Sequence, residues 1–378
     1  MKVLIATNSI GLYQGGHGRN IYHLAQALKK LDIDVSIFSF LVHIDEILDK
    51  NIKIYRSSLR KYSLPAFSKE LSGFIEKRNF DIIHSNGAVN YYYFKHKNKI
   101  PTVFHARSHN LSNFKALLFD RNTYTSLRLV KNLFGACLEY YYDRNYLTRA
   151  SNIIANCADV KNRIVNDVGS CNRIEIIHNA INLPQESIYI YKDKYLNFGY
   201  LANFYPIKGW DYLTKIMKFS LKENMNIKFF LAGDGPLFKT IQNEFYNEIK
   251  NNRINFLGRL DSQEKKDKFF KSIDCFVCPA HAPTTVTEAL SYGIPVLHFK
   301  RWFDCADGMD VDDFLNTGCY FQSNDLSPVN AVKIINNVST IFQSFDANRV
   351  RKIIEEKYTW SNTGFKTLNF YKEILDEK

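Results

Sequence analysis

Long apolar runs are missing from this 378-residue sequence. A helix that spans a membrane needs about 20 consecutive, mostly apolar residues, and no segment of the sequence reaches that length. We therefore expect a chain that does not cross a bilayer. The sequence also lacks an A-x-A-like cleavage site near its first apolar run, Val3–Ala6, which we interpret as a buried first strand.

Cysteine is scarce, and the seven cysteines are odd in number and scattered. This distribution argues against a disulfide framework and indicates a reducing compartment, so we expect a cytoplasmic protein. Cys275 and Cys278 have the C-x-x-C spacing of some zinc and redox sites, but no second pair stands at zinc spacing. We interpret both as structural cysteines of a buried strand.

Acidic residues are few in the first half of the chain. Residues 1–186 contain 25 Lys and Arg against 15 Asp and Glu, whereas residues 187–378 contain 25 against 23. Most of the net charge of +12 thus lies in the first half, which favours nucleic acid or an anionic membrane as partner. Drift in a Lys- and Asn-rich sequence is the alternative. Since no nucleic-acid-binding module accompanies the charge, we expect no nucleic acid partner.

The segment 104–149 combines basic charge with aromatic residues. Within it, Phe114–Arg121 has the mixture of apolar and basic residues found in helices that lie at a lipid interface. An ordinary helix between two lobes is the alternative. The first interpretation predicts peripheral association of the first domain with the inner face of the cytoplasmic membrane.

Short apolar runs alternate with amphipathic stretches along the chain, which is typical of parallel sheets covered by helices. We predict an α/β fold of two Rossmann-like domains, residues 1–186 and 187–350, followed by a helical segment, residues 351–378. Ligands of such sheets bind at the carboxyl ends of the strands, so an inter-domain cleft would hold one shared site. The predicted strands are Val3–Ala6, Asp34–Phe40, Ile82–His84, Thr102–His105, Asn152–Ala155 and Ile174–Ile177, then Leu196–Leu201, Ile227–Ala232, Ile254–Leu257, Cys275–Cys278 and Pro295–Phe299.

A glycine-rich turn, Gly11–Arg19, follows the first strand and opens a helix. Glycines there let backbone amides approach an anion, so Gly15 and Gly16 are candidates for contact with a phosphate. The turn lacks the G-x-G-x-x-G spacing of a dinucleotide site. A tight turn without a ligand is the alternative.

Two segments of the second domain carry further candidates. Lys208 precedes Gly209 at a helix start, where its charge could neutralise a departing diphosphate; a solvated loop lysine is the alternative. Gly233, Asp234 and Gly235 form a turn directly after a strand, where backbone can approach a ligand. Glycine turns of this kind are nevertheless common in α/β proteins.

The most specific segment runs from Cys278 to Val296. It reads as a strand, a polar loop, a short helix and a strand begun by Gly-Ile-Pro-Val. Glu288 lies near the start of that helix, where its carboxylate could accept hydrogen bonds from a ribose. A helical glutamate without such a role would face solvent instead.

These motifs together resemble glycosyltransferase family 4, a large GT-B group that includes many bacterial capsule, lipopolysaccharide and exopolysaccharide transferases. The resemblance covers nearly the whole chain and depends on the order and spacing of the motifs. The motifs are Gly15-Gly16 with Arg19, Phe80–His84, Ser108–Asn110, Ile176–Ala180, Lys208-Gly209, Gly233–Pro236, Phe256–Gly258, Glu288-Ala289 and Gly293–Val296.

The resemblance implies that the second domain grips a nucleotide diphosphate sugar, the first holds the acceptor, and the final helix crosses back to the first domain. Such enzymes usually retain the anomeric configuration and need no metal; no other cofactor is expected. The catalytic residues that it implies are His109, Lys208 and Glu288, of which Lys208 would hold the diphosphate and Glu288 the ribose. The implied donor-binding residues are Gly15, Gly16, Lys208, Gly233, Asp234, Gly235, Gly258, Arg259 and Glu288, with the backbone amides of Thr284 and Thr285 at the distal phosphate. His109, or alternatively His105, would face the transferred sugar.

Two positions depart from the family pattern. A second glutamate usually stands eight positions before the helical one, where this chain has Ala280, beside His281. An arginine usually stands five positions before the lysine, where this chain has Asn203. Loss of one preorganised charge costs about 10²–10³ in rate, so another cation such as Arg259 or Arg301 would have to compensate.

The sequence therefore predicts a hexosyltransferase that acts on a lipid-linked or surface-glycan acceptor. A catalytically weak family member that serves as a binding or assembly partner is an alternative, which Ala280 and Asn203 favour. A nucleotide-sugar epimerase of similar fold is another, but sparse carboxylates argue against it. The sugar, the base, the acceptor, the linkage and the oligomeric state are not predicted.

Overall fold

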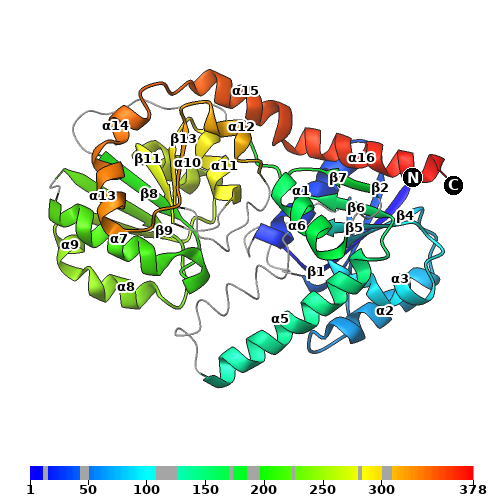
Figure 1. Cartoon of the computed structure of the whole chain (residues 1–378). Coiled ribbons are helices and arrows are strands. Elements are labelled where there is room, and N and C mark those ends of the chain that lie inside the picture. Colours follow the sequence, from blue (N-terminus) through cyan, green and yellow to red (C-terminus); the bar gives the residue numbers. More distant parts are fainter. Residues whose placement is uncertain are drawn as a thin grey trace. The chain divides into compact units, whose positions relative to one another are not determined.

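A computed structural model describes residues 1–11, 16–42, 51–107, 126–169, 173–184, 196–223, 226–279, 283–299 and 309–377. The chain divides into two compact units. Unit 1 consists of Met1–Phe114, Val130–Ala180 and Lys357–Lys378, and unit 2 of Lys115–Leu129 and Ile181–Glu356. Each unit is built on one parallel sheet covered by helices (Figure 1), so the predicted α/β fold of two Rossmann-like domains is confirmed. The predicted boundaries after residues 186 and 350 stay predictions.

Unit 1 contains a seven-stranded sheet in the order β3-β2-β1-β4-β5-β6-β7, and its paired strands are parallel. The strands are β1 (Lys2–Ile10), β2 (Asp34–Val42), β3 (Lys53–Arg56), β4 (Ile82–Asn86), β5 (Thr102–Ala106), β6 (Asn152–Ala155) and β7 (Arg173–Ile176). The strand order changes direction between β1 and β4. In an open α/β sheet, the crevice beyond the carboxyl ends of the strands at such a switch point is the usual ligand site.

Helices cover the sheet of unit 1 because their apolar residues recur at the helical period. They are α1 (Gly16–Lys29), α2 (Leu64–Glu76), α3 (Tyr91–His96), α5 (Ser126–Leu147), α6 (Ala158–Val168) and α16 (Trp360–Asp376), with a 3-10 turn η1 (Ala88–Asn90). The C-terminal helix α16, red in Figure 1, packs on α1, where Gly364 leaves room for Ala27 and the Trp360 and His23 rings lie 5.2 Å apart. The predicted return of the final helix to the first domain is thus confirmed.

Unit 2 contains a six-stranded parallel sheet in the order β10-β9-β8-β11-β12-β13. Its strands are β8 (Leu196–Leu201), β9 (Ile227–Ala232), β10 (Ile254–Gly258), β11 (Cys275–Cys278), β12 (Val296–Phe299) and β13 (Tyr320–Ser323). Its helices are η3 (Pro206–Lys208), α7 (Trp210–Glu223), α8 (Phe238–Glu244), α9 (Tyr246–Lys250), α10 (Gln263–Ser272), α11 (Pro283–Ser291), α12 (Asp312–Leu315), α13 (Pro328–Asn336) and α14 (Val338–Ile341), and α15 (Ala347–Lys357) ends at the unit boundary. Cys275 and Cys278 are buried in β11 and neither forms a disulfide, in keeping with a structural role.

Two strands, β3 and β13, are not predicted from the sequence, and each forms an edge of its sheet. An edge strand has one neighbour and is partly exposed, as the burial of β3 and β13 shows, so neither carries a fully apolar run. Helix α1 begins at Gly16, earlier than the predicted start at Ile21, so that part of the predicted glycine turn is helical. Among the described helices, none is both long enough and apolar enough to span a bilayer.

Candidate active site

The candidate donor-binding residues of unit 2 come from loops at one edge of its sheet. Lys208 lies in η3, which follows β8, and Glu288 lies in α11, which follows β11. Strands β8 and β11 are adjacent and parallel, and the strand order changes direction between them. Both segments therefore leave the carboxyl edge of the sheet at its switch point, where α/β sheets bind ligands.

The backbone around Lys208 is fixed to the core of unit 2. The Tyr200 hydroxyl donates to the Lys208 carbonyl at 2.6 Å, and the Trp210 indole donates to the Asn203 carbonyl at 3.2 Å. Both aromatic side chains are buried. Gly209 ends the turn with φ of 79°, a left-handed conformation that suits glycine. Asn203, where the family has arginine, is exposed in this loop.

Thr284 and Thr285 lie in the first turn of α11 and are half-buried. The first N–H groups of a helix have no partner within the helix, and the helix dipole places positive potential there. This geometry suits the predicted contact between the two backbone amides and a phosphate.

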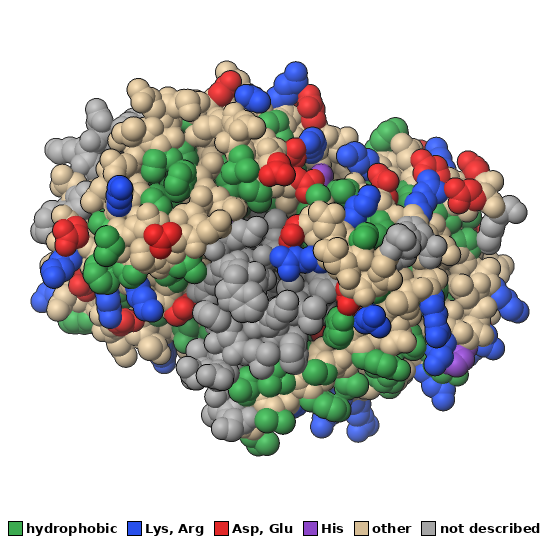
Figure 2. Space-filling view, in the orientation of Figure 1, with side chains coloured by type: hydrophobic (Ala, Val, Ile, Leu, Met, Phe, Trp, Pro, Cys, Tyr) green, Lys and Arg blue, Asp and Glu red, His purple; other side chains and the backbone are tan. Residues whose placement is uncertain are grey.

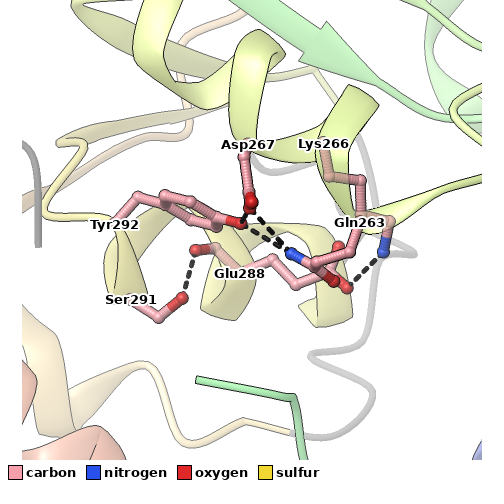
Figure 3. A network of polar contacts seen from close by, with 6 residues as sticks. All are labelled: Gln263, Lys266, Asp267, Glu288, Ser291 and Tyr292. Carbon is pink, nitrogen blue, oxygen red and sulfur yellow. Dashed lines mark hydrogen bonds and ion pairs between the residues drawn. The ribbon is translucent and has the colours of Figure 1, made fainter. Parts of the chain in front are cut away.

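Glu288, on α11, is held by a lysine from the neighbouring helix α10. The Lys266 ammonium lies 2.7 Å from Glu288 Oε1, and the two side chains are only 16% and 11% exposed. Figure 3 shows the two groups pointing toward each other from their helices. Burial of both charges strengthens their attraction. The Lys266 charge offsets that of the Glu288 carboxylate. A Glu288 that contacts a ribose would therefore repel a nearby diphosphate less.

A second set of contacts joins the same two helices. Gln263 Nε2 donates to the Tyr292 hydroxyl at 2.8 Å and contacts Asp267 Oδ1 at 2.9 Å, and the Tyr292 hydroxyl also bonds to Asp267 (Figure 3). The Ser291 hydroxyl donates to the Glu288 carbonyl at 2.6 Å. The two bonds made by Tyr292, which directly follows α11, tie the end of that helix to α10 and so help to position the Lys266–Glu288 pair.

The glycine turn after β9 is required by the fold. A Cβ on Gly233 would lie 2.0 Å from the Ala202 carbonyl oxygen, and Gly233 has φ of 135°. The turn is tied to its neighbours by the Phe204 N–H, which donates to Asp234, and by the Gly233 N–H, which donates to Gly258 at 2.7 Å. The loops after β8, β9 and β10 thus pack into one layer. This packing alone accounts for the glycines of the turn, and no ligand is needed to explain them.

Other predicted donor-binding residues flank this layer. Asp234 is exposed, and its carboxylate accepts the Gly235 N–H at 2.7 Å. Arg259 is exposed directly after β10, two strands away from β8. Their roles stay predictions.

Several predicted positions lie outside the described residues: Gly15, His109, Ala280, His281, Arg301 and the segment Phe114–Arg121. Gly16 is the first residue of α1. The alternative to His109, His105, is described and is buried at the end of β5 in unit 1.

Three buried side chains of unit 1 form a hydrogen-bonded chain that ends at His105. The Tyr371 hydroxyl of α16 lies 2.6 Å from His84 Nδ1, and His84 Nε2 lies 2.9 Å from His105 Nδ1. Burial and the nearby Arg107 charge lower the pKa of His84 to about 3, so its imidazole is neutral. Burial also raises the pKa of Tyr371, which keeps its hydroxyl protonated.

These protonation states assign the tautomers. A protonated tyrosine donates to His84 Nδ1, so the single proton of the neutral His84 ring is on Nε2 and points at His105 Nδ1. His105 then carries its proton on Nε2. Because His105 lines a pocket at the carboxyl edge of the sheet, the chain orients this imidazole as a donor there.

No site role is predicted from the sequence for Lys266, His84 or Tyr371. Each lies far along the chain from the residue it positions: Lys266 is 22 residues from Glu288, and Tyr371 is 287 residues from His84. His84 was noted as part of a family motif, but without a role. Only the fold brings these partners together.

Comparison with known families covers both units. The family model described as Glycosyltransferase Family 4 matches residues 14–185, and the model described as Glycosyl transferases group 1 matches residues 186–302. Together the two matches extend over both sheets.

Curated relatives are distant and are named as glycosyltransferases. An uncharacterized glycosyltransferase of Methanocaldococcus jannaschii is 28% identical over 386 residues, which cover 96% of each chain. One of Haemophilus influenzae is 24% identical over 366 residues, which cover 90% of this chain and 95% of the relative. With a second M. jannaschii glycosyltransferase, the chain is 24% identical over 226 residues and spans about half of that relative, 55%.

Solved structures share the fold over nearly the whole chain. The lipopolysaccharide outer core galactosyltransferase WaaB superposes with a TM-score of 0.69 at 16% identity, covering 98% of this chain and 100% of WaaB. The Anabaena protein HepE, solved in complex with UDP and glucose, superposes with a TM-score of 0.68 at 14% identity, covering 98% and 99% of the chains. These likenesses establish the two-sheet architecture.

Proposed function

Because this chain belongs to the family 4 glycosyltransferases with the GT-B fold, we propose that it transfers a hexose from a nucleotide diphosphate sugar to a lipid-linked or surface-glycan acceptor. The observation that carries this proposal is the common origin of Lys208 and helix α11 at the switch point of the second sheet. The segments that leave the carboxyl edge of the sheet at this point carry a lysine, a helix N-terminus and a carboxylate paired with Lys266.

The chemistry follows from these groups. The bond between the anomeric carbon and the diphosphate oxygen breaks, and its electron pair goes to that oxygen. The Lys208 ammonium and the α11 N-terminus stabilise the developing charge without a metal. An acceptor hydroxyl then forms the new bond to the same face of the anomeric carbon and passes its proton to the departing diphosphate oxygen, so the configuration is retained. Glu288, held by Lys266, orients the ribose through its hydroxyls.

A binding experiment tests the donor side. A nucleotide sugar that binds the folded state raises its stability, by about 2.7 kcal/mol at a hundred times its Kd. We expect at least one member of a panel of UDP-, GDP-, ADP- and dTDP-sugars to raise the melting temperature. Lys208→Ala should abolish that shift and Glu288→Ala should weaken it, whereas Lys215→Ala, an exposed lysine on α7, should leave it unchanged. No shift with any donor, or equal shifts in all variants, would refute the site.

An exposed apolar surface on α5 supports a lipid-linked acceptor. Five exposed apolar side chains recur at helical spacing along α5: Leu127, Val130, Phe134, Leu138 and Tyr141. Figure 2 shows hydrophobic and basic side chains gathered along the lower edge, where Figure 1 places α5. Contiguous exposed apolar side chains commonly mark interaction sites. The first half of the chain also carries most of the net positive charge, which would attract an anionic membrane.

Liposome pelleting tests this surface. We expect the chain to pellet with vesicles that contain phosphatidylglycerol and not with phosphatidylcholine alone, and we expect salt to weaken the binding. Phe134→Ser should reduce pelleting, while Phe365→Ser, an exposed phenylalanine of α16, should not. Pelleting that is insensitive to both salt and Phe134→Ser would contradict this surface.

A further inference from the structure

Unit 1 contains a pocket of about 130 Å³ at the switch point of its own sheet. Asn8 and Asn86 line it from the ends of β1 and β4, the two strands between which the strand order changes direction. His105 and Arg107 line it from the end of β5, and α5 contributes two carboxylates. The pocket lies entirely within unit 1 and is formed by residues that the structure describes.

Arg107 is the unusual member of this pocket. Its side chain is 7% exposed, and its Nε and Nη1 atoms are buried without a hydrogen-bond partner among the described residues. Burial lowers the pKa of the guanidinium to about 9. Buried N–H groups of a charged side chain are unfavourable when they lack acceptors, and the planar fork of arginine matches the two oxygens of a carboxylate or a phosphate. An anionic ligand group would remove this cost.

Two acidic residues of α5 also line the pocket. Glu139 and Asp143 lie one turn apart on α5, and Asp143 Oδ1 accepts the Ala88 N–H at 3.1 Å. Burial and the proximity of the two carboxyls raise the pKa of Asp143 to about 7, and burial also raises the pKa of Glu139. Two carboxyls here would repel a free polyanion. They suit the hydroxyl groups of a sugar, which can both donate and accept hydrogen bonds.

The remaining lining fits a sugar ring. Asn86 Nδ2 donates to the Thr7 hydroxyl at 3.1 Å, which fixes the amide and directs its oxygen elsewhere. The Tyr62 ring lines the pocket and offers an apolar face. The oriented His105 imidazole adds a donor. The pocket thus combines one guanidinium, two carboxyls, amides and an aromatic ring, a set that suits a polyhydroxylated ring with one acidic substituent.

We propose that this pocket binds an acidic sugar residue of the acceptor, with the carboxylate or phosphate of that sugar against Arg107 and its hydroxyls against Asp143 and Glu139. That this sugar belongs to the acceptor rests on the proposed function; recognition of an acidic sugar does not. The ligand class is set by the pairing of an anion-binding fork with a hydroxyl-binding wall.

Saturation-transfer NMR with the full chain tests this proposal. The probes are glucuronic acid, glucose 6-phosphate, glucose and inorganic phosphate. We expect one or both acidic sugars to bind at least about tenfold more tightly than glucose, and inorganic phosphate to compete weakly. Binding of glucuronic acid alone, or of glucose 6-phosphate alone, identifies the acidic group as carboxylate or phosphate.

Variants assign the binding to the pocket. Arg107→Gln should remove the preference for the acidic sugar, and Arg107→Lys, which keeps a charge but loses the fork, should retain part of it. Arg149→Gln, an exposed arginine that follows α5, should change nothing. Equal binding of acidic and neutral sugars, no binding of either acidic sugar, or an unchanged preference in folded Arg107→Gln would overturn the proposal. Inorganic phosphate that binds as tightly as the acidic sugars would overturn recognition of the sugar.

Nucleotide-sugar binding by the same samples keeps the two proposals apart. A variant that binds a donor but not the acidic sugar has lost only this pocket. Wild-type protein that binds the acidic sugar and no donor would refute the proposed function and leave the pocket intact.

Discussion

Replacing Gly233 with alanine tests whether the glycine turn after β9 is a requirement of the fold. The new Cβ would lie 2.0 Å from the Ala202 carbonyl oxygen and 2.8 Å from its carbon, so backbone must move. The residue also has φ of 135°, which strains any side chain. Backbone strain of this kind costs about 1–3 kcal/mol, and overpacking costs about 1–3 kcal/mol more.

The expected loss of stability is therefore about 2–6 kcal/mol. For a unit of this size, each kcal/mol lowers the melting temperature by about 2–4 °C, so we expect the transition of unit 2 to fall by at least about 4 °C. Differential scanning calorimetry of the purified chain measures this shift.

Two other glycines provide matched controls. Gly258 has φ of 64°, but a Cβ there meets nothing within 4 Å, so Gly258→Ala isolates the backbone strain and should cost about 1–2 kcal/mol. Gly73, in α2, also has open space, and its φ is not in the left-handed region, so Gly73→Ala should be neutral or slightly stabilising. Wild-type stability of Gly233→Ala, or equal losses in Gly233→Ala and Gly258→Ala, would refute the packing argument.

Three further outcomes are expected. Tyr371→Phe removes the 2.6 Å hydrogen bond to His84, so it should destabilise the protein by about 1–3 kcal/mol. It should also change the tautomer of His105, which nitrogen NMR detects. An unchanged spectrum would contradict the hydrogen-bonded series Tyr371–His84–His105. Lys266→Met removes the ammonium that pairs with the mostly buried Glu288 carboxylate, so it should lower both the melting temperature and the donor affinity. Lys265→Met breaks an equally short but exposed pair with Asp261 and should change neither. Equal effects of the two substitutions would show that burial of the pair is unimportant. The pKa of Asp143 is raised to about 7 in the folded chain from an ordinary value of 3.8, so the folded state binds this proton more tightly than the unfolded state does. The stability of the wild-type protein should therefore fall as pH rises from about 4 to about 7. Asp143→Asn should reduce this fall, as melting curves at pH 5 and pH 8 would reveal, and an unaltered pH profile would exclude a buried Asp143 carboxyl.

Much of the fold follows from local pattern. Buried parallel strands such as Ile82–His84 and Cys275–Cys278 are short apolar runs, and the sequence predicts them because both faces of such strands are covered. The edge strands β3 and β13 lack that signature because solvent covers part of them. The helical segment predicted over residues 351–378 contains α16, one face of which packs on α1.

The candidate site is less accessible to sequence reasoning. Lys208 and Glu288 belong to ordered motifs, so the family pattern identifies them. Lys266 lies on α10 in a charged stretch that resembles any solvated helix face, and only the fold places it 2.7 Å from Glu288. Arg107 likewise follows a predicted strand without any motif to distinguish it, and its burial at a switch point is a property of the tertiary structure.

Transfer from a nucleotide diphosphate sugar is tested most directly by following the sugar itself. The chain is incubated with a panel of nucleotide sugars that carry a radiolabelled hexose, together with a lipid extract of bacterial membranes as acceptor. We expect label to pass from one donor into the extract with release of the nucleoside diphosphate, and Lys208→Ala to stop this transfer while Lys215→Ala does not. Folded wild-type protein that moves no label from any donor would contradict the claim.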